Sequence, residues 1–250
     1  MTDWIEANVI KIKKWKFPLF SIIINAKILP FIPGQFTKIA IFENEKKIQR
    51  AYSYVNSPKN KNLEFYIAYV KNGIITKKLY NLNPGNKIMI SKKSFGFFTL
   101  KEIPKTKNIW MISTGTAIGP FLSILQNGGK EIKKFNRIIL IHAVRYKNQF
   151  NYKKIIKKIK LKYNNNFLFQ KIVSREKLGK NYLFGRIPEL FNNNTIEKKI
   201  NININNKNSH FMICGNPNMV KDTRKILIKK YKLKKNLRKK PGNITTENYW

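Results

Sequence analysis

The sequence predicts two domains, an N-terminal antiparallel β-barrel and a C-terminal α/β domain built on a parallel sheet. Short apolar segments divided by turn residues fill the first hundred positions, which is typical of small all-β domains. After Lys107 buried-type strands alternate with helical segments, the pattern of βαβ units. The chain of 250 residues is 42% hydrophobic, enough for two ordinary folded domains. We place the domains at residues 1–100 and 101–250.

The N-terminal strands are expected at residues 8–13, 19–25, 35–42, 50–54, 63–70 and 87–91. Pro33-Gly34, Asn72-Gly73 and Asn83-Pro84-Gly85 are the turn signals between them. One short helix fits, at 76–80, and residues 95–104 are expected to cross to the next domain. Six short strands at this spacing favour a closed antiparallel barrel over a parallel sheet.

The C-terminal strands are expected at residues 108–113, 137–144, 167–173 and 210–214. A helix begins near Pro120, because proline favours a first helical turn. Further helices are expected at 152–161, 187–191 and 217–230, on both faces of the sheet. The Asn-rich stretch 192–208 is interpreted as a loop.

The formal net charge of +39 resembles that of nucleic-acid-binding proteins. The lysines are spread over the whole chain together with abundant Asn and Ile, the residues of A/T-rich codons. Mutational bias therefore explains the charge better than selection for a polyanion, and we predict no specific nucleic-acid partner.

Other features indicate a soluble cytoplasmic protein, expected to be a monomer. The first residues lack the basic and apolar regions of a secretory leader. The longest apolar stretch, residues 20–32, is broken by Asn25 and Lys27 and is too short to span a membrane. The single Cys214 and the two histidines make a disulfide, a zinc site and an iron–sulfur cluster improbable.

A glycine-containing turn, Ser113-Thr-Gly-Thr-Ala-Ile-Gly-Pro120, joins the first C-terminal strand to its helix. Glycines at such a turn let the backbone approach a dinucleotide phosphate. Strand-to-helix turns often contain two glycines, so the turn alone is weak evidence.

The next two strands each end in an arginine, Arg145 and Arg175, where NAD-binding sheets usually carry an acidic residue. Ligands bind at the carboxyl edge of a parallel sheet, and guanidinium groups suit a 2′-phosphate. The pair therefore favours NADPH over NADH, although two of many surface cations would look the same.

Arg50, Tyr52 and Ser53 come from one predicted strand, Arg50-Ala-Tyr-Ser53. Arg50 could pair with a pyrophosphate, Tyr52 could stack on a flavin ring, and Ser53 could donate a hydrogen bond to it. An ordinary amphipathic strand would explain the tyrosine and leave Arg50 unexplained. Because one cysteine and two histidines leave no metal or iron–sulfur site, redox chemistry must come from a bound organic cofactor.

These segments together resemble the bacterial ferredoxin/flavodoxin–NADP reductases nearly from end to end. The matching segments are Gln49–Pro58, Thr114–Pro120, Ser174-Arg-Glu176, Gly185-Arg-Ile-Pro188, Cys214-Gly-Asn-Pro217 and the terminal Tyr249-Trp250. The resemblance implies an FAD-binding barrel, an NADP-binding domain with a C-terminal aromatic extension, and a flavin in the cleft between them.

The resemblance also implies the site residues. FAD would be held by Arg50, Ala51, Tyr52, Ser53, Tyr66, Ile67, Ala68, Tyr69, Ile74, Ile75, Thr76 and Thr116. NADP would be held by Val144, Arg145, Ser174, Arg175 and Arg186, with Asn216, Pro217, Asn218 and Asp222 close by. Tyr249 and Trp250 would stack on the flavin and adenine rings, and the catalytic residues would be Ser53, Cys214 and Tyr249. Gly73-Ile-Ile-Thr76 departs from the more polar family pattern, which leaves the flavin phosphate contacts to backbone and Thr76.

A member of this family passes a hydride between NADPH and the flavin, then single electrons between the flavin and an acidic carrier, flavodoxin or ferredoxin. The basic segment 221–240 is the expected docking helix. The alternatives are an NADPH-dependent reductase of free flavins or of an oxygenase and, more remotely, a basic nucleic-acid-binding protein.

Overall fold

The computed structural model describes residues 3–43 and 45–249, and its contacts divide the chain into two compact units. The first unit contains the chain up to Thr99 together with Gly119–Asn127. The second contains Leu100–Ile118 and the chain from Gly128 onward. Assignment of residues 1–100 and 101–250 as the functional domains stays a prediction.

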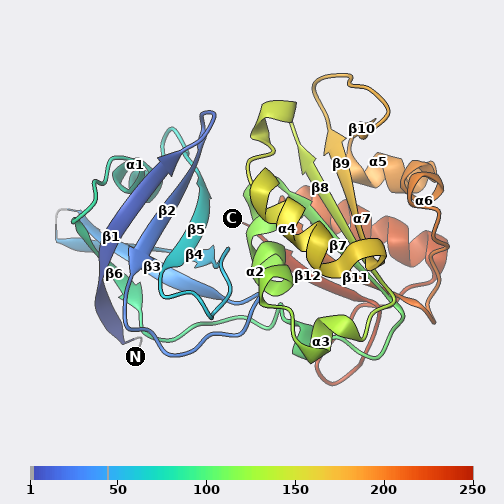
Figure 1. Cartoon of the computed structure of the whole chain (residues 1–250), viewed down its shortest axis with the longest axis horizontal. Coiled ribbons are helices and arrows are strands. Elements are labelled where there is room, and N and C mark those ends of the chain that lie inside the picture. The colour runs from blue at the N-terminus through green and yellow to red at the C-terminus, as the bar shows by residue number, and fades with distance from the viewer. Residues whose placement is uncertain (1–2, 44, 250) are drawn as a thin grey trace. The chain divides into compact units, whose positions relative to one another are not determined.

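The first unit is built on one curled sheet of six antiparallel strands (Figure 1). Their order in the sheet is β4-β3-β6-β1-β2-β5. The edge strands β4 and β5 meet at a single bridge, Tyr54 to Phe65, so the barrel has a short seam. The strands are β1 (Trp4–Lys14), β2 (Leu19–Asn25), β3 (Phe36–Glu43), β4 (Lys46–Ser53), β5 (Leu63–Ala68) and β6 (Lys87–Ser91).

Alternation along the strands builds the core of this unit. On β2 the side chains of Phe20, Ile22 and Ile24 are all fully buried, because every second residue of a strand faces the same side. Tyr54 belongs to this core: its ring stacks on Phe31 at a centroid distance of 3.8 Å. The helices of the unit are α1 (Ile74–Tyr80) and α2 (Gly119–Asn127).

The second unit contains a parallel sheet with strand order β10-β9-β8-β7-β11-β12. Helix α4 covers one face, and α5 and α7 cover the other (Figure 1). The strands are β7 (Asn108–Thr114), β8 (Arg137–Val144), β9 (Phe167–Val173), β10 (Tyr182–Phe184), β11 (Ser209–Gly215) and β12 (Ile244–Asn248). The helices are α3 (Lys130–Lys133), α4 (Lys153–Tyr163), α5 (Ile187–Asn192), α6 (Thr195–Ile200) and α7 (Pro217–Tyr231), with 3-10 turns at Leu100–Glu102, Gly115–Ile118, Lys147–Gln149 and Asn164–Asn166.

The predicted fold class is confirmed, but two local predictions are wrong and two strands were missed. The stretch 192–208 is not all loop, because it contains α6. The basic segment 221–240 is helical only to Tyr231, after which Lys232 takes a left-handed conformation with φ of 55°. Two strands were missed: β10 has only three residues, and β12 reads Ile-Thr-Thr-Glu-Asn, too polar to resemble a buried strand.

Helix α2 follows the glycine turn in sequence but groups with the first unit. The hydroxyl of Ser123 donates to the carbonyl of Asn56 at 2.7 Å, and the amide of Gln126 donates to that of Val55 at 2.8 Å. These bonds hold α2 against the residues that follow β4. Among the described residues no helix is both long and apolar enough to cross a membrane.

Candidate cofactor-binding site

Strand β4 carries the predicted flavin-binding residues of the first unit. Arg50 is exposed and its Nη1 donates to the neighbouring carbonyl of Gln49 at 2.8 Å. Burial raises the pKa of the Tyr52 phenol far above its ordinary value, and the Arg50 charge offsets this only partly. Ser53 is buried and Ala51 exposed. The strand therefore presents an exposed guanidinium, with no ion pair among the described residues, beside a phenol that stays protonated.

The second group of predicted flavin-binding residues lies on the second half of β5 and at the start of α1. Tyr66 and Ile67 are buried on β5, and the ring of Tyr69 packs edge-on against Tyr80 at 5.4 Å. The Thr76 hydroxyl accepts from the Val70 N–H and donates to the Gly73 carbonyl, both at 3.1 Å. That hydroxyl shapes the turn before α1, so polar groups for a phosphate in 74–76 come from the backbone.

In the second unit the glycine turn after β7 is fixed from two directions. His142 on β8 has its Nε2 2.9 Å from the carbonyl oxygen of Gly115; because a carbonyl only accepts, Nε2 carries the hydrogen. The Thr114 hydroxyl accepts from the Asn216 N–H at 3.1 Å, which joins this turn to the one after β11. Gly115 has φ of 55°, a conformation that favours glycine, and Thr116 beside it is buried.

The turn after β11 depends on one glycine and one cap. Gly215 has φ of 141°, and a Cβ there would lie 2.1 Å from the Thr114 hydroxyl oxygen. The Asn216 side chain accepts from the N–H groups of Asn218 (3.0 Å) and Met219 (3.2 Å), a standard helix N-cap, and Pro217 begins α7. Glycine is therefore required at 215 because the turn after β11 packs directly against Thr114.

Three arginines follow three adjacent strands at the carboxyl edge of the sheet. The N–H of Arg175 donates to the carbonyl of Arg145 at 3.0 Å, and the N–H of Ser174 donates to that of Val144 at 3.1 Å. Gly185, directly before Arg186, donates to the carbonyl of Val173 at 3.0 Å. All three arginine side chains are exposed, and none has an ion-pair partner within residues 3–43 and 45–249. The edge can therefore take a phosphate group.

Cys214 has a neighbour that sequence reasoning missed. Strands β11 and β12 pair Cys214 with Glu247, and the thiol lies 3.9 Å from a carboxylate oxygen. Burial, reinforced by the Glu247 charge, raises the pKa of the fully buried Cys214 thiol well above its ordinary value. The thiol stays neutral at physiological pH, so Cys214 cannot act as a thiolate nucleophile. If residues 244–248 had been recognised as a strand next to β11, Glu247 would have been predicted beside Cys214.

The aromatic terminus is described only in part. The N–H of Tyr249 donates to the carbonyl of Gly215 at 2.9 Å, so β12 delivers Tyr249 beside the turn that follows β11. Asp222 is exposed on α7. The stacking predicted for Trp250 lies outside the described residues.

Two family models match the chain, one in each half. Residues 12–97 match the oxidoreductase FAD-binding domain. Residues 111–225 match the oxidoreductase NAD-binding domain. The order agrees with the predicted order of the two cofactor domains.

Relatives that match over the full length of the chain identify its family. The chain is 53% identical over 259 residues to the flavodoxin/ferredoxin–NADP reductase of Buchnera aphidicola subsp. Schizaphis graminum, and 42% identical over 250 residues to that of Escherichia coli K12; all of each chain is covered. A solved ferredoxin NADP+ reductase of Neisseria gonorrhoeae, with FAD and NADP bound, superposes with a TM-score of 0.90 at 29% identity and covers 99% of both chains. The chain therefore belongs to the flavodoxin/ferredoxin–NADP reductase family of oxidoreductases.

Proposed function

We propose that this chain transfers electrons between NADPH and a small acidic carrier protein, flavodoxin or ferredoxin, with FAD as its bound cofactor. The observation that carries the proposal is the edge formed by Arg145, Arg175 and Arg186, which suits the 2′-phosphate that distinguishes NADPH from NADH. When bound, the flavin exchanges a hydride with the nicotinamide and single electrons with the carrier.

In the first unit Arg50 would hold the FAD pyrophosphate. Tyr52 would pack on the flavin ring, and Ser53 would donate a hydrogen bond to it. Tyr66–Tyr69 and residues 74–76 would contribute mainly backbone groups, because the Thr76 hydroxyl is engaged in its own turn. Ala51 has no bulk that would interfere with a ring beside it.

In the second unit the glycine turn would supply Thr116 and backbone N–H groups. The carboxyl ends of β8 and β9 would supply Val144, Ser174 and the arginines. Asn216–Asn218 and Asp222 would lie beside the nicotinamide half. Each charge-assisted bond from an arginine contributes about 1.5–3 kcal/mol, so losing two would weaken NADPH binding by about two to four powers of ten.

Cys214 and Tyr249 would shape the place where the nicotinamide reacts. The neutral Cys214 thiol, beside Glu247, offers a hydrogen-bonding wall without a nucleophile. Tyr249 and Trp250 would cover the flavin and yield to the nicotinamide. Deleting Tyr249 and Trp250 should change the rate of hydride transfer or the retention of FAD; a variant unchanged in both would contradict this gating role.

The carrier would dock on a basic surface that includes the exposed lysines of α7 and of the segment after it. These are Lys221, Lys225, Lys229, Lys232, Lys234, Lys235, Lys239 and Lys240. Complementary charge raises the association rate with an acidic partner. A monomeric state and a cytoplasmic location stay predictions.

The test is spectroscopic. Purified protein should show the visible absorption of bound FAD, and anaerobic NADPH should bleach it far faster than NADH. Added flavodoxin should then be reduced. A colourless protein that takes up no FAD would overturn the flavin assignment, and equal bleaching by NADH would remove the role of the arginine edge.

A further inference from the structure

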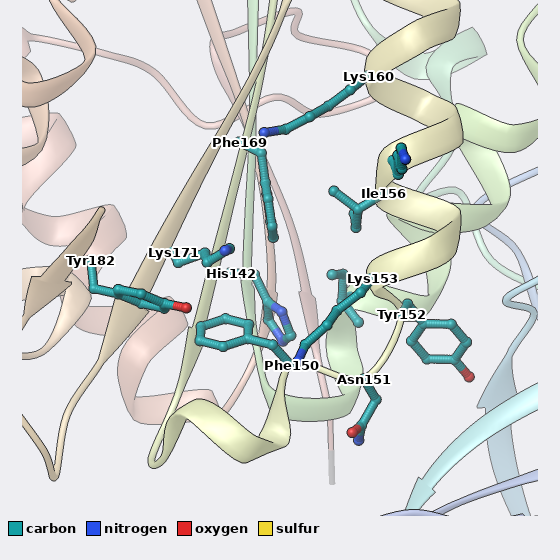
Figure 2. Close-up of a pocket in the computed structure, with 12 residues that line it drawn as sticks. His142, Phe150, Asn151, Tyr152, Lys153, Ile156, Lys160, Phe169, Lys171 and Tyr182 are labelled. Carbon is teal, nitrogen blue, oxygen red and sulfur yellow. The ribbon is translucent and has the colours of Figure 1, made fainter. Parts of the chain in front are cut away.

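A hollow of about 310 Å³ lies under helix α4 in the second unit (Figure 2). Strand β10 pairs with β9 only along Lys171–Val173, so the first half of β9 has no strand on its outer side. Helix α4 crosses above this uncovered part and leaves a space beneath it. Its volume is at the lower end of the range for small-molecule sites, which fits a mononucleotide better than a dinucleotide.

Aromatic rings form the walls of this α4 pocket. The His142 and Phe150 rings meet edge to face at 5.3 Å, and Tyr182 lies 5.9 Å from Phe150. Phe169 extends the wall along β9. The bond from His142 to the Gly115 carbonyl holds the back of the pocket in place. Such walls suit a flat ring, because aromatic groups stack or meet edge to face.

Ammonium groups supply the charge at this pocket. Lys153, Lys157 and Lys160 are spaced so that they share one face of α4, and all three line the pocket together with Lys171. Figure 2 shows Lys153 and Lys160 reaching from the helix toward the sheet, with Lys171 on the strand side. The Lys171 Nζ lies over the Tyr182 ring at 4.9 Å.

No negative charge balances these lysines. The pocket lining contains no Asp or Glu, and the three α4 lysines have no ion pair in the part of the chain that the structure describes. Like charges on one helix face repel one another, and an anion bound between them would relieve that repulsion.

The pocket is separate from the proposed dinucleotide edge. Its lining includes none of the residues predicted to hold NADP. The side chains that form it from the sheet belong to His142, Phe169, Lys171 and Tyr182, on the face that α4 covers, whereas the arginines follow the strand ends.

We propose that the α4 pocket binds a small planar aromatic anion, a ring that carries a phosphate, of the size of a nucleoside monophosphate. The ring packs between Phe150, Phe169 and Tyr182, and the phosphate lies among the lysines. The inference goes beyond the proposed function and does not depend on it, since no flavin or nicotinamide is needed for this binding.

The test is calorimetric titration of AMP into the full FAD-loaded chain, with NADP+ present at saturation. We expect one AMP to bind per chain. Lys153→Gln/Lys160→Gln should weaken this binding at least about tenfold. The matched control is Lys154→Gln/Lys158→Gln, which removes two exposed lysines from the same helix outside the pocket lining and should leave the affinity within about twofold.

Two further ligands show whether the ring, the phosphate or both are recognised by the pocket. 1-Naphthyl phosphate should also bind if the ring and the phosphate are what the pocket recognises, and inorganic phosphate should bind far more weakly. Absence of saturable AMP binding, displacement of AMP by NADP+, equal losses in the two double variants, or phosphate binding as tight as AMP would each overturn the proposal. A chain that fails to bind NADP+ would count against the proposed function alone, because the AMP titration can then be run without it.

Discussion

Arg145 and Arg175 were predicted as a pair because each directly follows a buried strand. The structure brings their backbones into hydrogen-bonding contact, since β8 and β9 are adjacent and end at the same edge. Arg186 joins them through β10, a strand too short to be recognised from its sequence. Local pattern therefore shows that Arg145 and Arg175 follow strands. Arg186 was predicted only from the family resemblance, and the sheet shows that it follows a strand at the same edge.

Substituting Arg175 tests the coenzyme preference. Arg175→Ala should raise the KM for NADPH about tenfold to a hundredfold, because it removes one charge-assisted contact to phosphate. The KM for NADH should change little. Steady-state kinetics with both coenzymes measures this, and Lys154→Ala, an exposed cation on α4, is the control that should alter neither. An equal rise for both coenzymes would contradict the assignment.

Gly215 tests the turn after β11 through stability. Gly215→Ala should lower the free energy of unfolding by about 1–3 kcal/mol, because the added Cβ meets the Thr114 hydroxyl oxygen and φ is 141°. Gly179→Ala is the matched control: its Cβ meets nothing within 4 Å, so its effect should stay within about 0.5 kcal/mol. Urea unfolding of both variants gives the comparison.

The two buried histidines predict a loss of stability in mild acid. Burial lowers the pKa of both His142 and His210 from 6.5 to about 4, so below pH 6.5 the unfolded chain binds more protons than the folded one. The contribution of the two neutral histidines to the free energy of unfolding is fully present above pH 6.5 and is lost as the pH falls toward 4. The loss is about 2–3 kcal/mol per histidine between pH 7 and 4.5.

Urea unfolding across this pH range checks the effect of the histidines. The double variant His142→Gln/His210→Gln should show a shallower slope than the unmodified chain, whatever its absolute stability. Identical slopes would mean that the two imidazoles are not the source.

Among the helices and strands, the long ones were predicted, and so were the short β6, α1 and α5, whereas β10, β12, α3 and α6 were missed. Strands β7, β8, β9 and β11 were found because parallel strands buried on both faces appear in the sequence as apolar runs. Strand β12 is polar after its first residue instead, with Ile244 fully buried and Thr245 to Glu247 half-buried. It was interpreted only as an aromatic extension, although it places Glu247 beside Cys214. The helix predicted at 217–230 matches α7 (Pro217–Tyr231), but the docking helix at 221–240 was extended too far because lysines continue beyond the end of α7.

Strand β12 should contribute to the stability of the second unit. Ile244→Ala should cost about 2–5 kcal/mol, since it leaves a cavity in a closed core. Ile228→Ala on α7, where the side chain is 41% exposed, is the control and should cost far less. Thermal and urea unfolding would show the difference; equal losses would mean that β12 is not packed as a core strand.

For the molecule as a whole, the net charge of +39 affects the rate of association with charged partners rather than the fold. Lysines occur in both units, on helices, strands and loops, so charge does not mark one site by itself. Under α4 the lysines line a hollow whose lining contains no Asp or Glu, and this placement carries the inference of an anion site there.

The charge predicts a salt-dependent reaction with the carrier. The second-order rate of flavodoxin reduction should fall at least about tenfold between low ionic strength and 0.5 M salt, because screening shortens the reach of the basic surface. Reduction of a small neutral quinone is the control and should change little. A flavodoxin rate independent of salt, measured by stopped flow, would contradict electrostatic docking.

Local sequence pattern was enough to predict the two-part fold class, the elements with strong periodicity and the positions of Arg50, Arg145 and Arg175. These depend on local period and turn chemistry, which neighbouring residues encode. The strand order, the grouping of α2 with the first unit, the pairing of Cys214 with Glu247 and the hollow under α4 became visible only in the folded chain. Each of these depends on contacts between segments far apart in the chain, and the short or polar segments involved gain their conformation from packing rather than from their own composition.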